Sequence, residues 1–150
     1  MRSKALLSAT LLLLPLTGGC GADEPLGRAS MAIELMGVNP AAVGSVTVFV
    51  LGGSGRGCTD IYSGAVDPLS PAAGLVGMKN VAFTGTTASA SFGGIPTGNR
   101  LFYVEAYSTS NGVGLPLGNG CALARVKQDK TTRVAINSVC ARNSNGQCVD

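Results

Sequence analysis

The sequence predicts an all-β protein whose folded domain is a two-sheet antiparallel sandwich of about seven short strands. In the apolar segments, every second residue is apolar, which is the period of a strand with one buried face. Turn residues such as Asn-Gly and Pro-x-Gly separate these segments. Glycine is frequent, at 22 residues, and apolar residues at helical spacing are nearly absent, so we expect at most one turn of helix, near residues 71–75.

Residues 1–19 have the three parts of a secretory signal peptide. Arg2 and Lys4 make the start positive, residues 5–16 are uncharged and rich in leucine, and small residues precede Cys20. The apolar run is shorter than the ~20 residues that a membrane-spanning helix needs, and Pro15 interrupts it. We therefore expect this segment to direct export and then to be removed.

The residues at the cleavage point, Leu16-Thr17-Gly18-Gly19-Cys20, resemble the lipobox of bacterial lipoproteins. The resemblance implies that Cys20 is diacylated and becomes the mature N-terminus, which anchors the protein in a membrane. Thr17 departs from the family pattern, in which leucine is commonest. The residue after Cys20 is Gly21 and not aspartate, and by resemblance to enteric lipoproteins this points to the outer membrane. The alternative is cleavage after Ala22, which gives a soluble periplasmic or secreted protein.

The cysteine count agrees with lipidation. The chain has 5 cysteines, an odd number for an exported protein, and lipid on Cys20 leaves Cys58, Cys121, Cys140 and Cys148 to pair in an oxidising compartment. The sequence allows any of the three connectivities. We favour Cys140 with Cys148, which closes a loop over residues 140–150, and Cys58 with Cys121, which crosses the domain. Loop-closure entropy then predicts stabilisation by roughly 2.5 and 4 kcal/mol, respectively.

A short polar tether is predicted over residues 20–29 and the sandwich over residues 30–139. Its strands are marked by apolar residues at period two. The alternating sets are Met31, Ile33 and Leu35; Val46, Val48 and Val50; Ala88, Ala90 and Phe92; and Phe102, Val104 and Ala106. Residues 52–77 form a long Gly/Pro-rich connection that Cys58 would pin, because long connections are uncommon unless they are functional or held in place.

The last two strands are predicted to form a hairpin over a three-residue loop at Gln128-Asp129-Lys130. In that register Ala122, Ala124 and Val126 face Ile136, Val134 and Thr132. Cys121 then lies away from Cys140, which disfavours a bond between these two.

The stretch 88–98, which ends in Ile95-Pro96-Thr97-Gly98, leads into Phe102-Tyr103-Val104-Glu105-Ala106. It resembles transthyretin-like and Cna-B-like modules, in which a strand ending in Phe passes through a Pro-x-Gly turn into a strand with Tyr-x-Val. The resemblance implies an Ig-like sandwich with an accessory, adhesive or stalk role. The cysteines and the 52–77 connection depart from that family. The chain is also similar to small cysteine-containing lipoproteins of uncharacterised role from soil bacteria such as myxobacteria.

The chain lacks the residues that several functional classes need. The chain has no histidine, which removes Ser-His and Cys-His nucleophile pairs and the commonest zinc sites, and it has no C-x-x-C pair. We expect no metal site, no cofactor and no enzymatic activity. Without the signal peptide, 9 of the 11 Lys and Arg remain against 8 Asp and Glu, and they are scattered, so no nucleic-acid partner is expected.

Three candidate sites remain. The Gly-rich stretch 52–57 lacks the Lys-Ser/Thr ending of a phosphate loop and is interpreted as a flexible loop. An acid pair for hydrolysis would have to come from Asp60, Asp67, Glu105 and Asp129, which by default are solvated. Tyr103 and Tyr107 share the outward face of one strand with Glu105, and they form either an exposed surface for a sugar or protein or a partly covered sheet face.

Together these patterns predict an exported, lipid-anchored envelope protein whose non-catalytic sandwich has a binding or structural role. Its expected partner is the membrane, through the lipid on Cys20; the sequence does not identify a protein or glycan partner. The alternatives are a carbohydrate-binding module that uses Tyr103 and Tyr107, and a carboxylate-dependent surface hydrolase.

Overall fold

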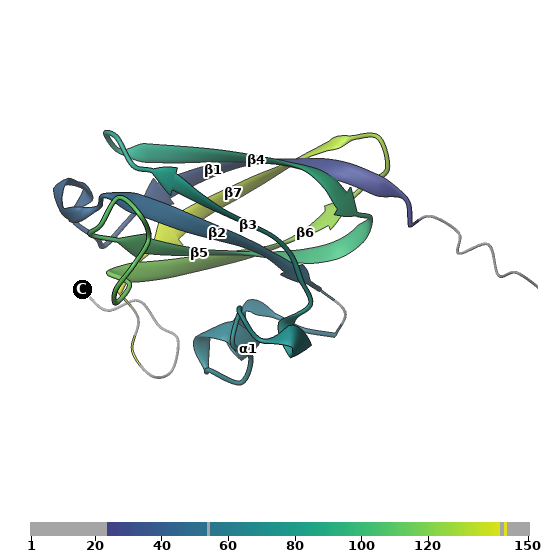
Figure 1. Cartoon of the computed structure of the whole chain (residues 1–150), viewed down its shortest axis with the longest axis horizontal. Helices are drawn as coiled ribbons and strands as arrows, with labels where there is room; N and C mark the ends of the chain where they lie inside the picture. The colour runs from purple at the N-terminus through teal and green to yellow at the C-terminus, as the bar shows by residue number, and fades with distance from the viewer. Residues whose placement is uncertain (1–23, 54, 142, 144–150) are drawn as a thin grey trace, which may run out of the picture.

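The computed structural model describes residues 24–53, 55–141 and 143, which form a β-sandwich of two sheets (Figure 1). One sheet has three strands in the order β4-β1-β7, and the other has four in the order β3-β2-β5-β6. The strands are β1 (Leu26–Leu35), β2 (Ser45–Gly52), β3 (Leu75–Ala82), β4 (Thr87–Pro96), β5 (Gly98–Tyr107), β6 (Gly118–Val126) and β7 (Thr131–Val139). The predicted fold class is therefore confirmed, with one exception, since β1 and β7 run parallel.

The main core lies between the two sheets and is built from the alternating residues that the sequence indicates. Phe102 is fully buried there, and Phe92 packs against the same cluster, as expected for two aromatics on either side of the Pro96 turn. Val46, Val48 and Val50 of β2 are also fully buried. Alternation at period two places these side chains on one face of each strand, so each sheet offers one apolar face to the other.

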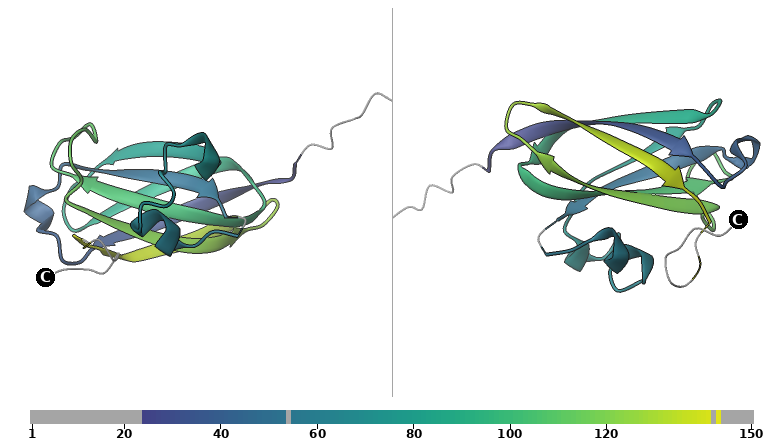
Figure 2. Two further views of the ribbon diagram at one scale, coloured as in Figure 1. Left: turned by 90° about the horizontal axis from the view of Figure 1, so that it is seen from below. Right: turned by 180° about the vertical axis from the view of Figure 1, so that it is seen from behind.

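A second core lies on the outer face of the four-stranded sheet. It consists of Phe49, Leu51, Ile61, Ala73, Leu101 and Tyr103. The connection between β2 and β3, which contains the short helix α1 (Cys58–Tyr62), folds back over this face and covers it (Figures 1 and 2). Because of this cover, β2 is buried on both faces along almost its whole length.

The connection contains one short element that the sequence did not predict and one that it did. The helix α1 was not predicted; it begins directly after the Gly-rich stretch, at Cys58. The expected turn of helix is present as a 3-10 turn at Pro71–Ala73. No helix within the described ranges combines the length and the apolar character that a membrane span requires.

The predicted hairpin of the last two strands is wrong. β6 pairs with β5, whereas β7 leaves for the other sheet and pairs with β1. Asn119 of β6 and Cys140, the residue after β7, form an isolated bridge. Val126, Val134 and Ile136 do contact the same core cluster, but from opposite sheets. The same apolar alternation serves a side-by-side pair and a face-to-face pair, so it does not distinguish them.

Part of the segment predicted as a tether, residues 20–29, is strand. β1 begins at Leu26, and Ala29 is already buried at 1% exposure. The Pro25 carbonyl accepts a hydrogen bond from the Thr97 N–H at 2.9 Å, which fixes the chain before the strand starts. Residues 20–23 of the predicted tether lie outside the described residues, so this part stays a prediction.

Candidate binding cleft on the covered sheet face

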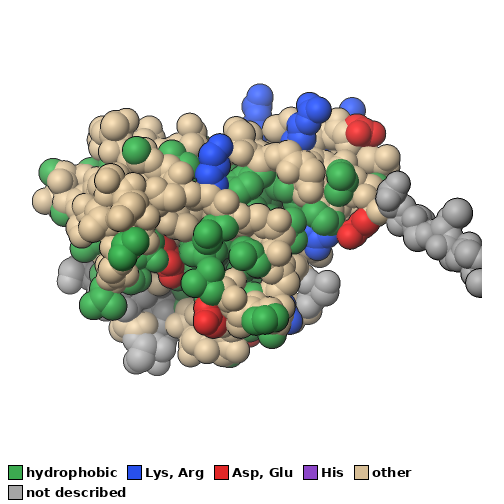
Figure 3. Space-filling model, in the orientation of Figure 1, with side chains coloured by type: hydrophobic (Ala, Val, Ile, Leu, Met, Phe, Trp, Pro, Cys, Tyr) green, Lys and Arg blue, Asp and Glu red, His purple; other side chains and the backbone are tan. Residues whose placement is uncertain are grey.

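A cleft of about 300 Å³ lies on the outer face of the four-stranded sheet, where the β2–β3 connection leaves that face uncovered. Strands β2, β3 and β5 form its floor, residues 67–69 of the connection form one wall, and Asn111 and Gly112 of the β5–β6 loop form another. In Figure 3 hydrophobic side chains gather on the lower part of the view, with acidic side chains among them. The cleft therefore combines apolar and acidic groups.

The strand register places three polar residues in one row across the floor. Thr47 of β2 is paired with Asn80 of β3 on one side and with Glu105 of β5 on the other. The next row of the same face holds Met78, Phe49 and Tyr103, by the same registers. Directly paired residues have their side chains on the same face of the sheet, so the cleft floor has a polar row beside an apolar row.

Glu105 is half-buried and held between two tyrosines of its own strand. The Tyr103 hydroxyl donates to one carboxylate oxygen at 3.0 Å, and the Tyr107 hydroxyl donates to the other. Residues two apart on a strand share a face, which is why all three side chains meet. Burial raises the pKa of both tyrosines above the ordinary range, and the neighbouring Glu105 carboxylate raises it further. Both hydroxyls therefore remain donors at physiological pH.

A hydrogen-bond network fixes the other end of the floor. The Asn80 Nδ2 donates to the Thr47 Oγ1 at 3.0 Å and to the Ser45 Oγ at 3.1 Å, and the Ser45 hydroxyl donates to the Thr109 carbonyl at 2.6 Å. Gly112 lies directly over this network with φ of 69°, and a Cβ at that position would come within 2.6 Å of the Thr47 Oγ1. Only glycine fits this combination of positive φ and close contact.

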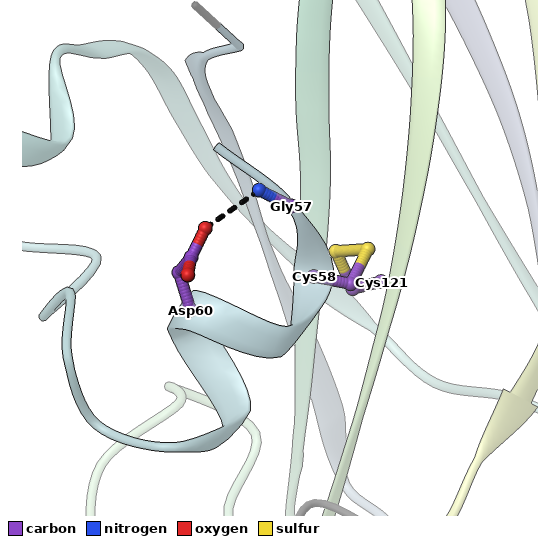
Figure 4. Close-up of a disulfide and its surroundings, with 4 residues drawn as sticks. All are labelled: Gly57, Cys58, Asp60 and Cys121. Atoms are coloured by element: carbon purple, nitrogen blue, oxygen red, sulfur yellow. Dashed lines mark hydrogen bonds between the residues drawn. A yellow bond between two sulfur atoms is a disulfide. The ribbon is translucent and has the colours of Figure 1, made fainter. Parts of the chain in front are cut away.

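The connection is attached to the sheet by the disulfide between Cys58 and Cys121, which confirms that predicted pairing (Figure 4). The bond joins the start of α1 to β6 beside the second core. The Gly57 N–H at the start of the helix donates to the Asp60 carboxylate at 2.7 Å. The Gly-rich stretch thus ends in a short helix whose N-cap N–H is already bonded to the protein's own acid.

The two candidate tyrosines do not form the exposed pair that was one of the two expectations. Tyr103 is 4% exposed and Tyr107 is 8% exposed, so their ring faces are not open to a sugar. The other expectation, a partly covered sheet face, describes what is observed. The signal for the cover was present in the sequence, because Phe49, Leu51 and Leu101 are apolar on the face that an uncovered sheet would turn to water.

The four candidate acids lie in three places. Asp60 caps α1, and Asp129 lies between β6 and β7 with φ of 52°. Asp67 and Glu105 line the same cleft, although nothing in their spacing indicates this. Asp67 is exposed, and its Oδ1 accepts the Leu69 N–H at 2.9 Å. Glu105 is half-buried between Tyr103 and Tyr107 and is not the fully solvated acid that the sequence suggested.

The remaining sequence-based sites are partly within the described residues. Cys140 is disulfide-bonded, and its partner lies outside the described residues, as do Cys20 and Cys148. The Cys140–Cys148 pairing and the lipidation of Cys20 therefore stay predictions. In the described part of the chain, no three His, Cys, Asp or Glu side chains are close enough together to hold a metal ion.

By fold and site, the described chain is a disulfide-linked β-sandwich with a cleft over one covered sheet. No protein-family model and no curated protein sequence matches it. Among solved structures, it is similar to a leucine-rich repeat protein from Bacteroides thetaiotaomicron, with 14% identity and a TM-score of 0.43 over 77% of this chain and 14% of that chain. It is also similar to Lip of Serratia marcescens, a membrane-bound component of the type VI secretion system, with 13% identity and a TM-score of 0.36 over 76% of this chain and 94% of that chain. Neither likeness bears on the function of this chain.

Proposed function

We propose that this chain is a lipid-anchored envelope protein whose sandwich binds a ligand non-catalytically in the cleft over Glu105. The observation that carries the binding role is the cleft itself, which has a fixed carboxylate on its floor and exposed apolar side chains at its rim. Leu69 and Met78 at the rim are 64% and 56% exposed. A concave site with a few fixed polar groups among apolar walls is typical of small-ligand sites.

Export to an oxidising compartment is supported by the disulfides. Cys58 and Cys121 are bonded across the second core, and Cys140 is bonded as well. Disulfides of this kind persist in exported proteins and are rare in the cytosol. They agree with the signal peptide and with the proposed lipid on Cys20, and the resemblance to lipoproteins favours the outer membrane as the destination.

The position of the cleft also suits an anchored protein. The chain enters the domain beside Thr97, which precedes β5, whereas Glu105 and Tyr107 lie near the other end of β5. A strand rises about 3.3 Å per residue, so the cleft lies roughly 25–30 Å from the point where the tether joins the domain. A domain that is held at Pro25 would therefore present the cleft away from its anchor.

Two measurements test this proposal. Labelled palmitate should enter the wild-type chain and not the Cys20→Ala variant, and membrane fractionation should find only the former in the outer membrane. A screen of small neutral fragments by NMR should give amide shift changes that cluster at Met78, Asn80 and Asn111. Wild-type protein that takes up no labelled palmitate would contradict the proposed lipid anchor. Amide shift changes scattered over the surface would contradict the cleft as the binding site.

One observation favours a second candidate, the carboxylate-dependent hydrolase. Asp67 and Glu105, two of the acids considered for that role, line the same cleft. Against it, both Glu105 oxygens already accept tyrosine hydroxyls and Asp67 accepts a backbone N–H, which are positioning roles. Turnover of chromogenic glycosides by the wild type, abolished in Glu105→Gln, would favour the hydrolase over the binding protein.

A further inference from the structure

We propose that the ligand of the cleft is a cationic group on an apolar stem, a primary ammonium or a guanidinium such as a lysine or arginine side chain carries. This inference rests on the proposed binding function and specifies its chemistry. It follows from the charge of the cleft, from the lone pairs left on Glu105 and from the apolar walls.

The charge of the cleft is acidic. Among the described residues, its lining includes Glu105 and Asp67 and no Lys or Arg. Lys79 of β3 is paired with Val48, a core residue, so its side chain points to the opposite side of the sheet from the cleft. Among the described residues, the ion pair that is present joins Arg100 to Glu24, outside the cleft. Glu105 therefore has no cationic partner among the described residues.

Glu105 is prepared to accept a further donor. A carboxylate offers about four lone-pair positions, and the two tyrosine hydroxyls use one on each oxygen. Because both tyrosines are themselves buried, the carboxylate is held in one orientation and does not have to be ordered when a ligand binds. A half-buried carboxylate without a counter-charge is more strongly stabilised by a cation than a solvated one would be.

The walls fit an alkyl stem. Phe49 and Met78 lie in the apolar row of the floor beside Glu105, and Pro68 and Leu69 belong to one wall. Leu69 and Met78 expose large apolar side chains at the rim that a ligand would cover. Lysine and arginine carry several methylene groups behind the charge, and these groups pack on apolar surface. The volume of about 300 Å³ is at the lower end of ligand sites, so it suits one side chain or a small amine.

Other ligand classes fit less well. An anion would meet two carboxylates, and a sugar would need an open aromatic face, which the buried rings of Tyr103 and Tyr107 do not offer. A divalent cation is the remaining competitor for acidic oxygens, and the experiment therefore includes it as a separate arm.

The test is an NMR titration of the full-length chain with intact disulfides. The probe is N-acetyl-lysine N-methylamide, with the norleucine analogue as the neutral isostere, 1,5-diaminopentane as a free amine, and calcium chloride alone. We expect the lysine probe to shift amides at Met78, Asn80 and Asn111 and the norleucine probe to bind at least about tenfold more weakly, since a hydrogen bond to a charged group contributes about 1.5–3 kcal/mol. Stronger binding of the lysine probe than of the diamine would indicate a protein side chain as the source, and the reverse a free amine.

The variants separate charge from shape. Glu105→Gln keeps the shape and should weaken the lysine probe about tenfold to a hundredfold, whereas Glu34→Gln, on the exposed outer face of the other sheet, should not change it. Leu69→Lys places a cation at the exposed rim and should also weaken the lysine probe, which decides the matter if Glu105→Gln folds poorly.

Three results would overturn the proposed ammonium or guanidinium ligand. They are equal affinity for the lysine and norleucine probes, unchanged affinity in Glu105→Gln and Leu69→Lys, and shifts produced by calcium alone. Absence of any lysine-dependent shift would do so too. Neutral fragments that bind the cleft in any of these cases would leave the proposed binding function intact, so the two failures are distinguishable.

Discussion

Removal of the Cys58–Cys121 disulfide should lower the free energy of unfolding by about 4 kcal/mol. The bond joins residues with a sequence separation of 63. In the chain-entropy model, the loss of this cross-link raises the entropy of the unfolded chain enough to lower the free energy of unfolding by that amount at 25 °C. Small domains have a total stability of about 5–15 kcal/mol. The variant with both cysteines replaced by alanine should therefore fold, but with a large share of its stability gone.

The assay is urea unfolding followed by far-ultraviolet circular dichroism, because the chain has no tryptophan to report on tertiary structure. A matched variant with Cys140 and Cys148 both replaced by alanine supplies the comparison. If those two are paired, their loop is short and the loss should be about 2.5 kcal/mol. Reduction of the wild type should reproduce the sum of both losses.

A loss below about 1 kcal/mol in the Cys58/Cys121 variant would refute this reasoning, since the connection would then be held by packing alone. A larger loss in the Cys140/Cys148 variant would refute the dependence on loop length. A loss well above 4 kcal/mol has a different meaning. It would indicate that the connection detaches from the sheet and exposes Phe49, Leu51 and Tyr103, which are buried beneath it.

Three smaller perturbations test the surroundings of the cleft and the turn before β5. Gly64 has a positive φ and open space around it, so Gly64→Ala should lower the free energy of unfolding in urea by about 1–2 kcal/mol. Gly112→Ala should lower it by about 1–3 kcal/mol more, because the added Cβ meets the floor network; equal losses would contradict the close contact. Arg100→Ala should lower the free energy of unfolding by about 1–3 kcal/mol, because the guanidinium donates to two turn carbonyls. Glu24→Ala, at the exposed partner of Arg100, should lower it by less than about 1 kcal/mol; the opposite order would make the ion pair the stabilising contact. Glu105→Gln should lower the pKa of Tyr103 and Tyr107 in an absorbance titration. Because each raised pKa makes the folded protein lose stability from the ordinary tyrosine value of 10.0 up to the folded-state pKa, this loss should end at a lower pH in the variant and be smaller in total, and an equal total loss would argue against the Glu105 contribution.

The sandwich was predictable because its main core obeys period two. Residues such as Val48 and Val104 alternate with residues of the other face, and the main core cluster lies on the inner faces of the sheets. The Cys58–Cys121 bond was also predictable, from the need to hold a long connection in place and from the even number of cysteines that the expected lipid on Cys20 leaves. Both inferences use constraints that hold before the chain is arranged in space.

Strand order was not predictable in the same way. The alternation in β6 and β7 fits a hairpin, and the actual arrangement satisfies it equally well with Val126 and Val134 in opposite sheets. Nothing in the period of one strand records which neighbour it pairs with. The same limit applies to the cleft, because Asp67 and Glu105 come together only through the path of the connection.

The cleft follows from the incomplete cover of the four-stranded sheet. The outer face of β2 and β5 is apolar at Phe49, Leu51 and Leu101, so this part has to be covered, and α1 with its disulfide covers it. Toward the far end of β5 the same face becomes polar at Thr47 and Glu105, where a cover would have to bury a carboxylate. The connection therefore turns away at residues 67–69 and leaves a concave site whose floor changes from apolar to acidic. A ligand that matches this floor has to change from apolar to cationic over the length of one side chain.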